Sequence, residues 1–260
     1  MTDGDDLFGG ATGARRSGQE VLRPAGPWTP AVHALMRHVA ATGVAETPEV
    51  LGLDESGDYE RLRWIPGDDN GVDLSSDDDL WQVGQLVRRV HDSLLSFSPP
   101  PDASWRLRCD GPTFIHGDIS PWNVVWRKDR IVGLPDWDQA GPGRDLEDLA
   151  YAAWAWVPLE APEDVPGHWH VRDPSLDAQQ SRLRLLVEAY GLSSHERSLF
   201  LSEIAYVQAV TAGRVAIGST HGDDGMRNIW WNGARVGVFG ASMKWLGSNW
   251  ASFDEALTRA

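Results

Sequence analysis

The sequence predicts an α+β protein that begins with a small antiparallel sheet and continues into a larger, mainly helical part. Up to Ile65, short apolar runs alternate with turn residues, which is typical of strands joined as hairpins. Beyond residue 76, apolar residues recur every three or four positions over long stretches, which is typical of helices that bury one face. Pro66-Gly67 interrupts the chain between the two patterns, so we expect one domain at 1–65 and another at 66–260.

Two hairpins and one helix are expected in the first part. Residues 7–23 form the first hairpin and residues 50–65 the second, because turn residues interrupt each run at its middle. Between them, Thr29 is expected to cap a helix that ends at Gly43, since a threonine side chain can accept a hydrogen bond from a free backbone N–H. His33 lies in this helix and is expected on its solvent-facing side.

The second part is expected to be built mainly from helices with buried apolar faces. Asp77, Asp78 and Asp79 place negative charge on the first turn of one of them, where the helix dipole favours it. The helices are predicted at residues 77–94, 145–157, 175–190 and 194–217, and in the tryptophan-rich segment after residue 229.

One polar block interrupts the helical pattern and carries the candidate chemistry. His116, Asp118 and Asn123 have the spacing His-x-Asp-x4-Asn, and Asp136 follows 13 residues after Asn123. The apolar runs between Asn123 and Asp136 predict a hairpin, which would bring these two residues together at one end. Their oxygens are hard ligands of the kind that Mg²⁺ takes when it also holds nucleotide phosphates. Asp118 would then accept the proton of an attacking hydroxyl.

This block resembles the catalytic loop and metal-binding motif of the protein-kinase-like fold, and more closely the aminoglycoside phosphotransferase (APH) family of small-molecule kinases. The resemblance covers most of residues 1–157. It implies a nucleotide-binding N-terminal lobe, a helical lobe for catalysis and acceptor binding, ATP or GTP as donor, Mg²⁺, and a small-molecule hydroxyl as acceptor. It rests on His116-Gly117-Asp118, Asp148-Leu149-Ala150-Tyr151, Arg23–Trp28 and Pro66-Gly67.

The resemblance also implies roles for residues outside the central block. The backbone of Trp64 and Ile65 would bind the adenine at the hinge between the lobes. Gly9 and Gly10 would lie over the phosphates, and a plain turn explains this pair equally well. Asp148, in the helix after the metal loop, would brace the catalytic loop.

Two further residues of the block, His116 and Asp138, are not expected to transfer protons or to bind the metal directly. His116 is expected to pack and hydrogen-bond within the catalytic loop, not to transfer protons. Asp138 stands where many kinases have glycine. It adds a second carboxylate behind the metal site, or it faces solvent. Pro135 removes a backbone donor directly before Asp136, so the local loop is expected to differ from that of the family.

The sequence lacks the lysine that binds the nucleotide phosphates in the family. Its two lysines, Lys128 and Lys244, both follow the catalytic loop. Arg23, at the end of a predicted strand, is the closest substitute, and His33 or a neighbour falls near the position of the glutamate partner. Arginine binds phosphate bidentately but is not interchangeable with lysine. Arg23 either takes this role in an altered geometry, or it is an exposed arginine on an edge strand and the nucleotide is held weakly.

Two alternatives to an antibiotic kinase follow from these features. The missing lysine and the short glycine-rich loop are compatible with a nucleotide-binding pseudokinase that does not turn over. A kinase for a metabolic alcohol, such as choline or a sugar, fits the same residues. Residues 221–228 also satisfy His-Gly-Asp-x4-Asn, but no hairpin and no later aspartate at hairpin distance follow them, so we interpret this copy as a chance match.

Net charge, cysteine content and the lack of long apolar runs limit the classes of partner and the cellular compartment that we expect. The formal charge of −15 disfavours nucleic acid and anionic membranes and suits a cationic acceptor, although a solvated acidic surface explains it too. Cys109 is the only cysteine, so a reducing, cytoplasmic compartment is expected. The acidic N-terminus does not have the pattern of a signal peptide, and no apolar run is long enough to span a membrane. His168-x-His170 is too sparse for a metal site. The oligomeric state and the acceptor stay open.

Overall fold

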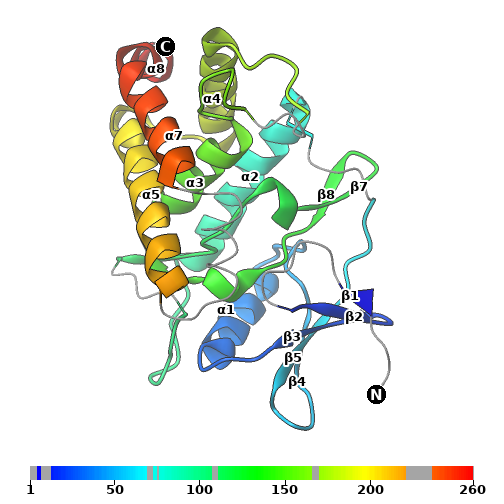
Figure 1. Cartoon of the computed structure of the whole chain (residues 1–260). Coiled ribbons are helices and arrows are strands. Elements are labelled where there is room, and N and C mark those ends of the chain that lie inside the picture. Colours follow the sequence, from blue (N-terminus) through cyan, green and yellow to red (C-terminus); the bar gives the residue numbers. More distant parts are fainter. Residues whose placement is uncertain are drawn as a thin grey trace. The chain divides into compact units, whose positions relative to one another are not determined.

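The structure is a computed structural model that describes residues 5–6, 13–68, 73–74, 76–106, 111–165, 170–220 and 236–259 (Figure 1). An antiparallel sheet forms the N-terminal region and helices dominate the C-terminal part, which confirms the predicted α+β class. Gly9, Gly10, Cys109, His168 and the second motif at 221–228 lie outside the described residues.

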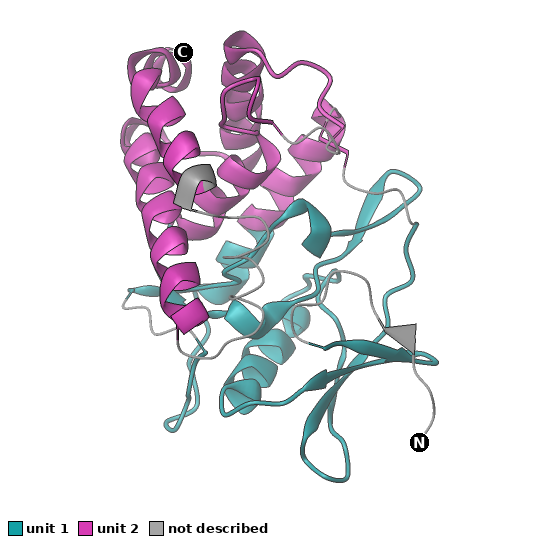
Figure 2. Cartoon of the chain, in the orientation of Figure 1, with its two compact units in different colours: residues 1–70, 89–145 teal, residues 71–88, 146–260 magenta. Residues whose placement is uncertain are grey.

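The chain consists of two compact units, which Figure 2 shows in different colours. One unit contains residues 1–70 and 89–145, and the other contains residues 71–88 and 146–260. This division differs from the boundary expected at residue 65, because the polar block around His116, Asp118 and Asp136 belongs to the same unit as the N-terminal sheet. Backbone hydrogen bonds within the first unit explain this, since Asp68 N–H donates to the Trp126 carbonyl at 2.7 Å and Leu134 N–H donates to the Glu46 carbonyl at 2.7 Å.

A five-stranded antiparallel sheet forms the N-terminal part of the first unit. The strands lie in the order β1-β2-β3-β5-β4. Both predicted hairpins are present in the described residues, with Gly18 in the left-handed region at the first turn, at φ 62°. The β3–β5 register places Arg23 opposite Glu60, so their side chains share one face. The bounds are β1 Asp5–Asp6, β2 Arg15–Ser17, β3 Glu20–Pro24, β4 Val50–Leu53 and β5 Tyr59–Arg63.

Helix α1, Thr29–Ala41, follows β3 and corrects two expectations. Thr29 is the first residue of the helix and does not cap it. Its Oγ1 instead accepts a hydrogen bond from Gly26 N–H at 3.0 Å, outside the helix. His33 was expected on the solvent side and is 4% exposed. The prediction was wrong because α1 is buried on more than one of its faces, and a carboxylate of the sheet satisfies the ring.

The rest of the first unit contains two pairs of short strands. Hairpin β7–β8 confirms the predicted return of the chain after Asn123, and it turns at Lys128 and Asp129, which have φ values of 49° and 59°. Gly67 passes so close to this hairpin that a Cβ there would lie 2.3 Å from Val125 Cγ1. The bounds are β6 Thr113–Ile115, β7 Val125–Arg127, β8 Arg130–Gly133 and β9 Gly141–Gly143, with β6 paired to β9.

Helices make up the second unit, and the C-terminal end of one of them, α2, lies in the first unit. Ser76 Oγ caps α2 by accepting from Asp79 N–H at 3.1 Å, and Gly191 ends α4 at φ 88°. Both positions agree with the helix bounds predicted at residues 77 and 190. No helix in the described part of the chain combines the length and the apolarity needed to cross a membrane. The bounds are α2 Asp77–Leu94, α3 Glu147–Trp156, α4 Leu176–Tyr190, α5 Ser194–Thr220, α7 Val236–Ser248 and α8 Trp250–Thr258.

Glu160, just after α3, is a buried carboxyl whose titration is expected to affect stability. It is 8% exposed, and burial raises its pKa to about 7, with a smaller contribution from the charge of Asp164. The folded protein therefore binds more protons than the unfolded chain between the ordinary glutamate value of 4.5 and about 7. The contribution of Glu160 to the free energy of unfolding is thus greatest below this window and falls as pH rises through it.

Replacing Glu160 by glutamine is expected to flatten this pH dependence. In urea denaturation, the free energy of unfolding of the wild type should fall by up to about 3 kcal/mol between pH 5 and pH 8 beyond the change seen in Glu160→Gln. The matched control is the exposed neighbour Glu163→Gln, which should keep the wild-type pH dependence. Equal pH dependence in wild type and Glu160→Gln would contradict the assignment.

Candidate active site

The His116 ring joins the predicted catalytic loop to the loop that carries Asp136. Its Nδ1 accepts from the Asp118 N–H at 3.2 Å, so its Nε2 carries the proton and donates to the Pro135 carbonyl at 3.0 Å. The ring also packs edge-on against Trp137, with centroids 4.5 Å apart. This pattern assigns a neutral imidazole whose two nitrogens both hold backbone groups. The geometry fits a structural role for His116, as expected.

Gly117 makes the tight turn between His116 and Asp118 possible. Its φ is +88°, and a Cβ there would lie 2.6 Å from the Gln139 carbonyl oxygen. Both the backbone conformation and the close approach therefore exclude a larger residue at this position.

Gly117→Ala is expected to destabilise the first unit by more than the ~1–2 kcal/mol that a left-handed conformation alone costs. Gly57→Ala is the control, because Gly57 has a similar φ of +80° and no atom lies within 4 Å of the place that a Cβ would occupy. Chemical denaturation of both variants separates the two effects. Equal destabilisation of the two would show that the Gln139 carbonyl moves aside readily.

Asp118 is held in place at its carboxylate and at its backbone. The side chain is largely buried, and its Oδ2 accepts from Gln139 Nε2 at 3.1 Å. Its carbonyl accepts from Asn123 Nδ2 at 3.1 Å. Sequence reasoning missed Gln139, whose position three residues after Asp136 was the available signal.

Asn123 and Asp136 offer the oxygens that a magnesium ion needs. Because the Asn123 amide nitrogen donates to Asp118, its Oδ1 points the other way, and no described residue donates to that oxygen. Asp136 adopts φ 67° and ψ 54°, a conformation rare for a residue other than glycine and often found at functional sites. Its side chain is 35% exposed, far more than its charged neighbours. One amide and one carboxylate oxygen fit Mg²⁺ that also binds phosphate.

No group of three or more His, Cys, Asp and Glu side chains in a metal-binding arrangement occurs among the described residues. A magnesium site here would therefore complete its coordination with phosphate oxygens and water, which Mg²⁺ commonly does.

Arg23 lies beside the Asp136 carboxylate. Its Nη2 is 2.6 Å from Asp136 Oδ1 and 3.5 Å from Asp138 Oδ2, and its Nε is 3.6 Å from Glu60 Oε1. The side chain is only 8% exposed, so the alternative of an exposed arginine on an edge strand is wrong. Strand β3 lies between β2 and β5, so Arg23 is not on an edge strand.

Glu60, on β5, is the acidic partner of Arg23, which the sequence did not reveal. We expected this partner near His33 on the helix. The helix instead contributes His33 itself, whose Nε2 lies 2.9 Å from Glu60 Oε2. Glu60 thus contacts a guanidinium from the neighbouring strand and an imidazole from α1.

Asp138 and Arg106 form a second charged pair next to Arg23. Asp138 is buried, which rules out the alternative that it faces solvent. Its Oδ2 accepts from Arg106 Nη1, and the Arg106 guanidinium lies over the Trp28 ring at 5.3 Å from the centroid. Sequence reasoning missed Arg106 because it lies in a loop without a motif.

Of the two predicted hinge residues, Trp64 and Ile65, the first already uses its backbone N–H within the first unit. Trp64 N–H donates to the Gln19 carbonyl at 2.9 Å, and the Arg16 guanidinium lies 4.6 Å from the Trp64 ring centroid. Ile65 packs against Gly133 of β8. No described residue hydrogen-bonds the Ile65 N–H, so this donor is available to a ligand.

Asp148 is fully buried near the start of α3, in the second compact unit. Its role as a brace of the catalytic loop, which belongs to the first unit, stays a prediction.

The five-stranded sheet, the His-Gly-Asp loop and the aspartate after a hairpin together define a protein of the protein-kinase-like phosphotransferase class. The family described as "Phosphotransferase enzyme family" (APH) matches residues 60–186. The trifolitoxin immunity protein of Rhizobium leguminosarum bv. trifolii is 37% identical over 204 residues, which cover 75% of this chain and 77% of that protein. The chain belongs to this phosphotransferase family, which confirms the resemblance.

Solved structures show the same fold at low sequence identity. The microcompartment-associated aminopropanol kinase has a TM-score of 0.65 and 11% identity, covering 97% of this chain and 93% of that chain. The GDP complex of a mutant aminoglycoside 2′-phosphotransferase-IIIa has a TM-score of 0.58 and 11% identity, covering 97% of this chain and 94% of that chain. The kinase-like fold is therefore confirmed.

Proposed function

We propose that this protein transfers the γ-phosphoryl group of ATP or GTP to a hydroxyl of a small molecule with the help of Mg²⁺. One observation supports this most strongly: hydrogen bonds through His116 and Gln139 tie the Asp118 loop to the loop of Asp136. A kinase needs a base and a metal-binding carboxylate held at a constant separation, because phosphoryl transfer depends mainly on positioning and charge neutralisation.

Asp118 is the proposed base. It would accept the proton of the acceptor hydroxyl while the hydroxyl oxygen bonds to the γ-phosphorus and the bond to the β–γ bridging oxygen breaks. The neutral side chain of Gln139 donates to the carboxylate, and the Asp118 N–H donates to the His116 ring. The carboxylate can therefore accept a proton in the orientation that the loop sets.

Asn123 and Asp136 would hold Mg²⁺, which supplies charge neutralisation to the phosphates when bound. Arg23 is proposed as the phosphate-binding cation in place of the family's lysine. Glu60 and Asp138 hold its guanidinium from two sides, and a guanidinium can bind phosphate oxygens bidentately. The Ile65 N–H is proposed to bind the adenine or guanine base, as the hinge does in the family.

A nucleotide-binding pseudokinase is the second candidate, and one contact favours it. Arg23 bonds directly to Asp136 Oδ1 at 2.6 Å, so the proposed phosphate-binding cation occupies an oxygen of the proposed metal ligand. If nucleotide and Mg²⁺ do not separate this ion pair, the protein binds nucleotide without productive metal coordination. Binding without turnover is the result that would distinguish this candidate.

The experiment is a transfer assay with γ-labelled ATP or GTP, Mg²⁺ and a set of acceptors. The set includes aminoglycosides and small amino alcohols, because the chain carries a formal charge of −15 and attracts cations. It also includes trifolitoxin, because a 37% identical relative is named as its immunity protein. Labelled product that requires Mg²⁺ supports the kinase. Stabilisation by nucleotide without transfer supports the pseudokinase, and no stabilisation by either nucleotide contradicts both.

A further inference from the structure

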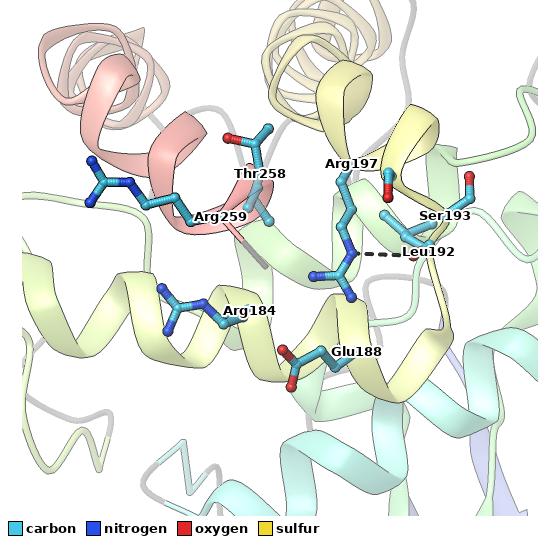
Figure 3. A pocket seen from close by; sticks show the side chains of 9 residues that line it. Arg184, Glu188, Leu192, Ser193, Arg197, Thr258 and Arg259 are labelled. Atoms are coloured by element: carbon cyan, nitrogen blue, oxygen red, sulfur yellow. Dashed lines mark hydrogen bonds between the residues drawn. The ribbon is translucent and has the colours of Figure 1, made fainter.

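The second compact unit contains a cavity that the proposed reaction does not use. It lies where the end of α4, the start of α5 and the end of α8 meet, and its volume is about 680 Å³ (Figure 3). This volume is within the range of small-molecule sites, about 300–1,000 Å³. All of its lining residues belong to the second unit, whereas the proposed catalytic and metal-binding residues belong to the first.

Two arginines of this cavity are anchored by the inner nitrogen of the guanidinium. Arg184 Nε donates to the Ala256 carbonyl at 3.0 Å, and Arg197 Nε donates to the Leu192 carbonyl at 3.2 Å, which Figure 3 marks with a dashed line. Within the described part of the chain, no carboxylate pairs with either side chain. Each guanidinium is thus fixed in direction while its outer donors keep no partner among the described residues. Because the two side chains are already held in place, they lose less conformational entropy when a ligand binds.

The charge of the cavity contrasts with that of the chain. Three arginines line it in a protein of formal charge −15: Arg184 in α4, Arg197 in α5 and Arg259 directly after α8. Arg259 bonds to Glu255 one turn earlier in α8, an exposed pair that contributes little and is easily exchanged for another anion. Glu188 is the one acid among the lining residues.

We propose that this cavity binds a small oxyanion with two or more negative charges, through the outer nitrogens of Arg184 and Arg197. Guanidinium groups match the paired oxygens of phosphates and of carboxylates, so the recognised chemistry is a multivalent phosphate or carboxylate. Arg259 is a third contact, which the ligand gains when the ion pair between Arg259 and Glu255 breaks. The Glu188 carboxylate opposes the ligand and limits its affinity. This site is independent of the proposed kinase activity.

The test is isothermal titration of the full chain at low salt with pyrophosphate and, separately, with citrate, in the absence of Mg²⁺ and nucleotide. Saturable binding of one or both is expected, and the comparison distinguishes phosphate from carboxylate. Arg184→Gln and Arg197→Gln should each weaken binding about tenfold or more, because each removes a charged guanidinium group that can bind two oxygens at once. Glu188→Gln should tighten binding several-fold. Arg197→Lys keeps the positive charge but cannot make the bidentate contact, so this variant should bind with intermediate affinity.

The control is Arg172→Gln, which removes one exposed positive charge from the same unit and should leave the affinity nearly unchanged. Melting temperatures show whether each variant is folded, and Glu188→Gln tests the site even if an arginine variant does not fold. Unchanged affinity in both arginine variants overturns the proposal, because pyrophosphate is then bound elsewhere. Equal weakening in Arg172→Gln, or no tightening in Glu188→Gln, also overturns it.

Discussion

Asp118→Asn is expected to lower Mg²⁺-dependent phosphoryl transfer about 10²- to 10⁴-fold, the range that a positioned general base contributes. Asparagine keeps the size of the side chain and can still accept from Gln139 through its oxygen, but it cannot take the acceptor proton. The contact from Asp118 N–H to His116 and the contact from Asn123 to the carbonyl use backbone atoms, so the loop should keep its shape.

The measurement compares transfer rates with nucleotide binding in the same variant. Thermal stabilisation by nucleotide with Mg²⁺ should stay close to wild type, because the proposed nucleotide contacts come from other residues. The matched control is Asp58→Asn, the same change at an exposed turn of the first unit, which should keep full activity. Transfer or nucleotide hydrolysis that survives in Asp118→Asn would remove Asp118 from the mechanism.

Arg23→Ala is expected to have the largest effect on stability in the first unit and to abolish nucleotide-induced stabilisation. The guanidinium lies within ion-pair distance of Glu60, Asp136 and Asp138, and two of these carboxylates are almost fully buried. Removing one partner of a buried ion pair typically costs about 3–5 kcal/mol, because it leaves an uncompensated charge. Three carboxylates without their shared cation should also repel one another.

Arg23→Lys separates the charge of this residue from its shape. A lysine ammonium keeps the positive charge but makes no bidentate contact, so it should restore much of the stability. It should also retain part of the nucleotide-induced stabilisation, since lysine has this role in the family. Denaturant titration with and without Mg²⁺ and nucleotide measures both quantities. An Arg23→Ala protein of wild-type stability and full nucleotide response would show that the site does not depend on Arg23.

Short-range features of this fold could be predicted from the sequence. Ser76 caps α2 and Gly191 ends α4 because local hydrogen bonding and a positive φ favour these residue types at those positions. The β7–β8 hairpin follows from two apolar runs around a two-residue turn. Thr29 shows the limit, since its side chain suits a cap but bonds to Gly26 outside the helix.

What the sequence alone determined, then, was the kinase-like class and the spacing of Asp118, Asn123 and Asp136, because residues close in the chain and short hairpins obey local rules. Tertiary structure alone decided which charges surround Arg23. Its contact with Asp136 joins residues 113 positions apart, and the Arg106–Asp138 contact spans 32 positions. The physical reason is that such contacts depend on strand register and on the packing of loops, and neither leaves a periodic pattern in the chain.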